Sequence, residues 1–292
     1  MSAATIPGPD PRPRAPTFAL PKLACDAHCH IFGPAATYPY AADRSYTPPD
    51  APLEHFRALH AKLGVQRAVI VNASVHGTDN RVALDAIAQS GGAYRAVANI
   101  DDSITERGLH ELQEGGVRGC RFNFVRHLGG LPDKRVFDRV VAMVAPLGWH
   151  IDLHFDAIDL PDYVDMLTRL PLSYTIDHMG RVKASDGLHQ HPFRTLVELM
   201  QRDEKCWVKV CGAERVSSAG SPFVDAVPFA RKIVETAPDR VLWGTDWPHP
   251  NVKVMPNDGD LVDLIPLFAP EPELQRKILV DNPARLFGFD TP

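Results

Sequence analysis

The chain has 292 residues, 45% of them hydrophobic, and a formal net charge of −5 at pH 7. This supplies enough apolar sequence for a sizeable core, and the length suits one α/β barrel domain. The negative charge gives no electrostatic basis for binding nucleic acid or an anionic membrane, so neither is expected as a partner. An anionic small molecule would have to be held by local arginine side chains.

Residues 1–22 carry six prolines and little apolar periodicity, which predicts an extended or disordered arm before a main domain at 23–292. The five cysteines form no C-x-x-C pair, and all of them lie in strand-like runs, so we expect reduced, buried thiols. The chain shows no secretory segment and no apolar run of about 18 residues. We therefore expect a cytoplasmic protein, as a monomer or small homo-oligomer.

From residue 23 onward, strand-like and helix-like segments alternate. The strand-like runs are 24–30, 67–73, 94–100, 117–124, 149–155, 172–178, 206–211 and 240–246. The helix-like stretches between them are 53–63, 79–90, 105–115, 133–146, 159–169, 192–202 and 223–236, and a last one follows at 271–288. This alternation predicts an α/β fold, a (β/α)8 TIM barrel with a single core.

A doubly wound α/β sheet is the alternative, but no glycine-rich phosphate-binding motif follows the first strand. The long segment 31–52 separates the first strand from its helix. A loop of this length in a compact domain is usually functional. We expect it to overhang the mouth of the barrel.

Four polar residues stand at the C-terminal ends of three strand-like runs: His28, His30, His178 and Asp246. In a barrel of parallel strands these ends meet on one face, where catalytic groups converge. Side chains two residues apart share a face of a strand. We therefore expect both strand 1 histidines to point into the barrel, and Cys25, Ala27 and Cys29 to face the helices.

Asp246 precedes Trp247-Pro248 at the end of the last strand, a position that favours a general base or a metal ligand. A structural N-cap of the following segment is the alternative. Together, histidine and aspartate can activate water, move protons, bind a metal or polarise a carbonyl group.

Five segments carry a closer pattern: His28-Cys29-His30-Ile31-Phe32-Gly33-Pro34, Ala73-Ser74-Val75-His76-Gly77-Thr78-Asp79-Asn80, Gly119-Cys120-Arg121-Phe122-Asn123-Phe124, Ile176-Asp177-His178-Met179-Gly180-Arg181 and Trp243-Gly244-Thr245-Asp246-Trp247-Pro248-His249-Pro250. They resemble the 2-pyrone-4,6-dicarboxylate lactonase family of the amidohydrolase superfamily, in unbroken order over roughly 24–288. The resemblance implies hydrolysis of a lactone ring without a required metal.

By this resemblance, Asp246 takes a proton from water, while His28, His30 and His178 surround the carbonyl oxygen and the water. The end of the fourth strand offers no Lys or Glu to bridge two metals, so a binuclear centre is not expected. The alternative is one Zn²⁺ held by these three histidines and Asp246.

The resemblance also implies a substrate pocket. Arg121 and Arg215 would clamp carboxylates, since guanidinium groups bind them bidentately; a surface ion pair is the alternative for Arg215. Tyr46, Ser74 and His76 would donate hydrogen bonds to the substrate or, alternatively, order the loops.

Two pocket positions depart from the family pattern: His127 replaces an arginine and His154 replaces a tyrosine. His154 could also add to a metal site. The resemblance implies a small anionic lactone as the substrate, and we expect 2-pyrone-4,6-dicarboxylate. The alternatives are 4-sulfomuconolactone, a sugar-acid lactone, a metal-dependent decarboxylation, and a barrel that binds a ligand without catalysis.

Overall fold

The computed structural model describes residues 3–125, 128 and 130–290, and it contains one sheet of eight parallel strands. In spatial order these are β2 (Cys25–Cys29), β4 (Arg67–Val71), β5 (Tyr94–Ala98), β6 (Val117–Asn123), β7 (His150–His154), β8 (Tyr174–Ile176), β9 (Cys206–Lys209) and β10 (Val241–Leu242). The segment after β10 closes the ring on β2: Ala27 N–H donates to Trp243 O at 2.8 Å, and Asp246 N–H donates to His28 O at 2.7 Å. The barrel is confirmed, and the doubly wound alternative is wrong.

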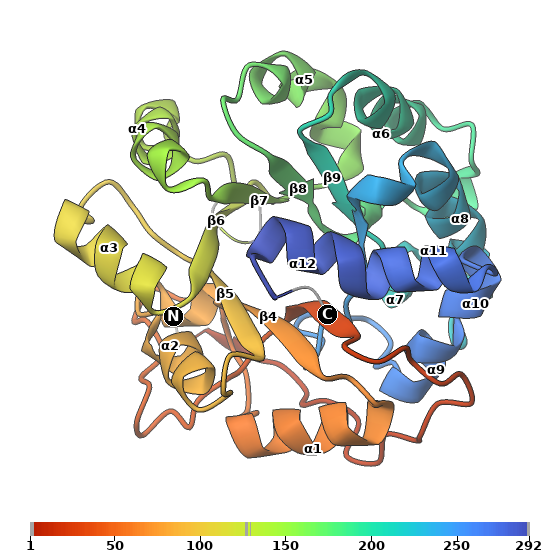
Figure 1. Ribbon diagram of the computed structural model, residues 1–292, viewed down its shortest axis with the longest axis horizontal. Helices are drawn as coiled ribbons and strands as arrows, with labels where there is room; N and C mark the ends of the chain where they lie inside the picture. Colours follow the sequence, from red (N-terminus) through yellow and green to blue (C-terminus); the bar gives the residue numbers. More distant parts are fainter. Residues whose placement is uncertain (1–2, 126–127, 129, 291–292) are drawn as a thin grey trace.

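Helices surround this ring (Figure 1). Those between the strands are α1 (Leu53–Leu63), α2 (Arg81–Ala88), α3 (Glu106–Glu114), α4 (Lys134–Val144), α5 (Leu160–Thr168), α6 (His191–Arg202), α7 (Ala213–Val216) and α8 (Val227–Thr236). After β10 come α9 (Asp258–Asp263), α10 (Ile265–Phe268), α11 (Pro272–Arg276), a π-helical turn (Lys277–Asp281) and α12 (Asn282–Phe287). The sequence patterns did not predict α7, α9 and α10.

The C-terminal segment closes the end of the barrel opposite the predicted site. Helix α12 lies across the ring in Figure 1, and Phe287 packs with the side chains of Val69 and Val97 inside it. Arg95, at the start of β5, donates to the carbonyl oxygen of Gly288 at 2.9 Å. Apolar side chains of the C-terminal segment therefore fill this end of the barrel.

Strand β2 departs from strict alternation, because its register against β4 shifts between Asp26 and Cys29. Cys25 and Ala27 pack inside the barrel with Phe287, so the expectation that they face the helices is wrong. Cys29 lies in the layer between strands and helices, as expected. Asp26 turns instead toward a histidine of α1, at 3.2 Å. All five cysteines are free and buried, as predicted.

The described part of the proline-rich arm is extended and attached to the barrel. Ala4–Thr5 (β1) pair in parallel with Tyr46–Thr47 (β3). Arg14 forms ion pairs with Asp260 and Asp263, both at 2.6 Å, and Asp263 also accepts two backbone N–H groups of the arm. The carboxylates of α9 therefore hold the arm against the barrel.

The 31–52 loop returns across the barrel mouth as expected: Phe32 pairs with Ala51, and Ala41 N–H donates to Val75 O at 2.7 Å. This course brings Tyr46 to the pocket described below. Within the described part of the chain, no helix combines the length and apolarity needed to cross a membrane.

Gly244 makes the closure of the barrel testable, because a Cβ atom there would lie 2.6 Å from the backbone nitrogen of His28. We predict that Gly244→Ala lowers the free energy of unfolding by about 1–3 kcal/mol, the usual cost of overpacking. Urea denaturation measures this change. Gly108→Ala, in helix α3, is the matched control and should be neutral or stabilising. Equal stabilities of wild type and Gly244→Ala would contradict the tight closure.

Candidate active site

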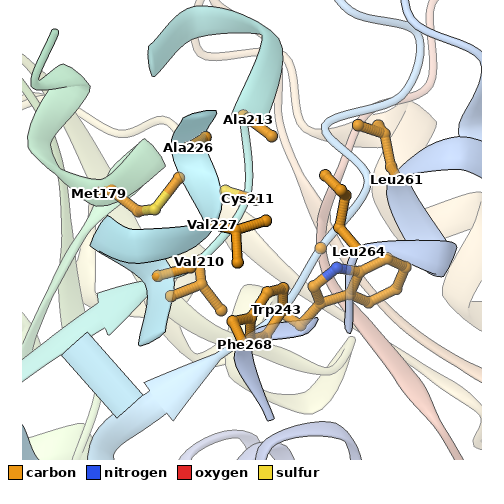
Figure 2. A pocket seen from close by; sticks show the side chains of 13 residues that line it. Met179, Val210, Cys211, Ala213, Ala226, Val227, Trp243, Leu261, Leu264 and Phe268 are labelled. Carbon is orange, nitrogen blue, oxygen red and sulfur yellow. The ribbon is translucent and has the colours of Figure 1, made fainter. Parts of the chain in front are cut away.

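A polar pocket of about 360 Å³ opens at the C-terminal ends of the strands. Its lining residues are His30, Tyr46, Ala73, Ser74, Arg121, Leu128, His154, His178, Arg215, Asp246, Pro250 and Asn251. Eight of the eleven candidate residues named from the sequence are among them. A second pocket of similar size lies beside β9 and helices α8 to α10, and Figure 2 shows that its side chains are almost entirely apolar. Of these two pockets, the first is the one lined by histidine, aspartate and arginine side chains.

Asp246 is buried in this pocket and held by an arginine. Its φ of 64° places it in the left-handed region, four residues after the end of β10. Arg215 contacts Asp246 Oδ2 through Nε at 2.7 Å and Nη2 at 2.5 Å. Burial alone would raise the pKa of Asp246, but the charge of Arg215 and the nearby histidines outweigh it and hold that pKa well below its usual range. Asp246 is therefore held as a carboxylate, whose Oδ2 is bound by the Arg215 side chain.

Three histidines face the other carboxylate oxygen of Asp246. The Nε2 atoms of His30, His28 and His178 lie 3.3, 3.5 and 4.0 Å from Asp246 Oδ1. The ring centroid of His28 lies 5.1 Å from that of His30 and 4.7 Å from that of His178, both edge to face. The structure thus brings together the four residues predicted as catalytic.

The backbone sets the tautomer of His30. Its Nδ1 lies 2.7 Å from the carbonyl oxygen of Val71, which can only accept, so Nδ1 carries a proton. Burial lowers the pKa of His30, which favours the neutral ring. Its Nε2 lone pair then points toward Asp246, and two acceptors converge where a water molecule could donate both protons.

His154 closes one wall of the pocket. Its Nε2 accepts from Arg181 Nη1 at 3.1 Å, and its Nδ1 donates to Asn123 Oδ1 at 3.0 Å. Burial, aided by the charge of Arg121, holds the pKa of His154 well below its usual range. Because Arg181 occupies the Nε2 lone pair, this geometry does not favour His154 as a metal ligand.

Arg121 projects into the pocket from β6 and is almost fully buried. Its Nη2 donates to Asp177 Oδ2 at 2.8 Å, whereas its Nε has no hydrogen-bond partner among the described residues. Arg215 is largely buried, and it pairs there with Asp246 and, at 3.5 Å, with Glu214, so these ion pairs do not lie on the surface. Both arginines predicted to clamp the substrate therefore lie at the pocket, each already bound to one aspartate.

The remaining pocket candidates fall into three groups. Tyr46 and Ser74 line the pocket and are hydrogen-bonded to each other, and burial raises the pKa of Tyr46 to about 12. His76 is not brought to the pocket; it packs on Tyr40, with ring centroids 5.1 Å apart. His127 lies outside the described residues.

Sequence reasoning missed a charged cluster directly beneath the histidines. Lys209 is fully buried and lies 2.7 Å from Asp152 Oδ1 and 3.1 Å from Asp177 Oδ1. A signal existed: Asp152 and Lys209 interrupt apolar strand runs, and Asp152 stands two residues before His154, on the same face. A charge at such a position must be paired inside the barrel.

Three of the four residues suggested as ligands of a single zinc lie close enough together to share an ion. His28, His178 and Asp246 place potential ligand atoms within 4.8 Å of one another. Two buried cations already contact this set: Arg215 on Asp246, and Lys209 at 3.0 Å from His28 Nδ1. Positive charges at these distances oppose a divalent cation, so the donor set does not fit a metal well.

Comparison with known proteins agrees with this geometry. The amidohydrolase family model matches residues 25–289. The chain belongs to this family. It is 46% identical to a 2-pyrone-4,6-dicarboxylate hydrolase of Comamonas testosteroni, over 94% of this chain and 93% of that protein. It is also 46% identical to a 4-sulfomuconolactone hydrolase of Hydrogenophaga intermedia, over 93% and 90% of the two chains.

Among solved structures, the chain superposes with a TM-score of 0.79 on an Acinetobacter baumannii protein assigned as a 2-pyrone-4,6-dicarboxylic acid hydrolase. That protein was solved with citric acid bound; it is 25% identical, over 91% of this chain and all of that one.

The ion pair with Arg215 gives a prediction about the titration of Asp246. In Arg215→Met the largest charge lowering the Asp246 pKa is gone while burial remains, so that pKa should rise and Asp246 should take up its proton at higher pH than in wild type. Carboxyl ¹³C NMR across a pH series measures this, with Asp246→Asn identifying the signal. Arg181→Met is the control, because Arg181 contacts His154 and Asp156 instead. Identical titration of Asp246 in wild type and Arg215→Met would contradict the account.

Proposed function

We propose that this protein hydrolyses the ring ester of a small anionic lactone. The observation that carries the proposal is the convergence of the Asp246 carboxylate with the Nε2 atoms of three buried histidines, at 3.3 to 4.0 Å. Asp246, His30 and His178 line the polar pocket, and His28 lies directly behind them. Two relatives that are 46% identical are named as lactone hydrolases, which supports this reaction class.

In the proposed reaction Asp246 takes a proton from water as the water oxygen attacks the lactone carbonyl carbon. His30 accepts the second hydrogen bond from that water through Nε2. Imidazole N–H groups stabilise the oxyanion that develops on the carbonyl oxygen, a role that donors in a buried site perform without a cation. The tetrahedral intermediate then collapses and the ring C–O bond breaks. The electron pair of this bond leaves with the ring oxygen, and the proton taken up by Asp246 is returned to the product.

The substrate should carry at least one carboxylate. Arg121 has a buried Nε with no partner in the described part of the chain, and a carboxylate oxygen would satisfy it. Arg215 adds a second positive group to the same pocket. We favour 2-pyrone-4,6-dicarboxylate, whose ring opening also releases a stabilised enolate as the leaving group. The equal identity to a 4-sulfomuconolactone hydrolase keeps the sulfonated lactone as the second candidate.

We further propose that hydrolysis needs no metal, because Arg215 and Lys209 already supply positive charge to the residues that would bind one. Breakdown of aromatic compounds in the cytoplasm is the setting we infer, from the substrate class and from the free, buried thiols.

A lactone panel with Asp246→Asn tests the reaction. Wild type should open 2-pyrone-4,6-dicarboxylate or 4-sulfomuconolactone, and Asp246→Asn should lower kcat by roughly 10²–10⁴-fold or more, because asparagine keeps the shape but is no base. Product formation followed by absorbance and mass spectrometry gives both results. Release of CO₂, or no turnover of any lactone, would contradict the proposal.

Recognition of the anion is tested by Arg121→Met. We predict that KM for a dianionic lactone rises about tenfold to a hundredfold, corresponding to the roughly 1.5–3 kcal/mol of a charge-assisted hydrogen bond. A neutral lactone should lose much less, and Arg121→Lys should fall between, since lysine keeps the charge without the fork. Equal losses on charged and neutral lactones would show a fold defect instead of a lost anion contact.

A further inference from the structure

Lys209 is fully buried, and its ammonium group lies among polar side chains beneath the active-site histidines. Its Nζ lies 2.7 Å from Asp152 Oδ1, 3.1 Å from Asp177 Oδ1 and 3.0 Å from His28 Nδ1. Two carboxylates at these distances keep the amine in its ammonium form. The hydrolysis proposed above uses the positive charge of this lysine but assigns it no step of proton transfer.

An ammonium group determines which ring nitrogen of a neighbouring histidine carries the proton. It has three N–H donors and no lone pair, so the His28 Nδ1 atom 3.0 Å away must accept. In a neutral imidazole the other nitrogen then carries the proton. His28 Nε2 points toward Asp246 Oδ1 at 3.5 Å, is buried, and has no hydrogen-bond partner among the described residues.

Asp177 would favour the other tautomer of His28, with the proton on Nδ1. Its Oδ1 lies 3.2 Å from the same Nδ1 and would accept a proton from it. That arrangement is the usual one in metal sites, where a carboxylate holds the N–H of a histidine and leaves the other nitrogen to bind the metal. Here Lys209 lies 3.1 Å from the same oxygen, and Arg121 donates to Oδ2 at 2.8 Å, so both oxygens of Asp177 already face cations.

We propose that Lys209 is a positioning residue that holds His28 as the Nε2–H tautomer, making this nitrogen a hydrogen-bond donor to the substrate and not a metal ligand. A nitrogen that carries a proton has no lone pair for a metal. If the chain hydrolyses a lactone as proposed, this N–H is directed at the developing oxyanion, while His30 presents a lone pair to the water. The tautomer itself does not depend on that reaction.

The test compares two variants that differ only at residue 209. Lys209→Met alone would leave the Asp152 carboxylate unpaired. We therefore compare Lys209→Met/Asp152→Asn, the test, with Asp152→Asn, the reference. The double variant loses one positive and one negative charge, so its net interior charge is that of wild type. The tautomer of His28 is read from long-range ¹H–¹⁵N NMR of histidine-labelled protein, with His28→Gln identifying its signals. We expect protonated Nε2 in wild type and in Asp152→Asn. The double variant should be protonated on Nδ1, which then donates to Asp177.

Zinc binding gives a second readout that needs no substrate. Titration calorimetry with zinc chloride should show binding to the double variant about tenfold to a hundredfold tighter than to Asp152→Asn, the scale on which a histidine's outer partner changes metal affinity. If a lactone is turned over, kcat of the double variant should fall about 10²–10³-fold relative to Asp152→Asn, with little change in KM, as for loss of one oxyanion donor.

Protonation of Nδ1 in wild type, or the same tautomer in Asp152→Asn and the double variant, would overturn the inference. A change of tautomer and of zinc affinity in a protein that opens no lactone would leave the inference standing and reject only the proposed function.

Discussion

Charges buried inside the barrel must be paired, and three ion pairs meet this requirement beneath and beside the pocket. Arg215 binds Asp246 at 2.5 Å, Lys209 lies 2.7 Å from Asp152, and Arg121 binds Asp177 at 2.8 Å. Removing one partner of such a pair leaves an uncompensated charge, typically at a cost of about 3–5 kcal/mol. The positions of these side chains are therefore coupled, and they set the electrostatics of everything that lines the pocket.

This pairing also distributes the chemical roles. Arg215 lowers the pKa of Asp246, so the carboxylate is ionised at neutral pH and can accept a proton. The same interaction makes it a weaker base. Arg121 uses one donor on Asp177 and directs another into the pocket, where an anion would bind. Lys209 and the carbonyl of Val71 set opposite tautomers on His28 and His30, one a donor and one an acceptor. Carbonyl polarisation thus uses a protonated Nε2 on His28, and water activation uses an unprotonated Nε2 on His30.

The sequence predicted the barrel and the positions of the main site residues, but not the local register or the ion pairs. Strand ends follow from apolar runs, and parallel strands bring their ends together, so His28, His178 and Asp246 could be placed before any coordinates. The register shift in β2 could not, because it depends on where Asp26 finds partners across the barrel seam. The pairing of Arg215 with Asp246 was also missed, since α7 has only four residues and no recognisable periodicity.

Buried cations of the protein, in place of a metal, set the charge and protonation of the residues that activate the lactone. The most direct measurement is kcat/KM for 2-pyrone-4,6-dicarboxylate before and after exhaustive chelation, with the metal content of the same samples determined by mass spectrometry. The account predicts unchanged kcat/KM at metal contents far below one ion per chain. Activity that is lost with a stoichiometric ion and restored when zinc is returned would contradict it.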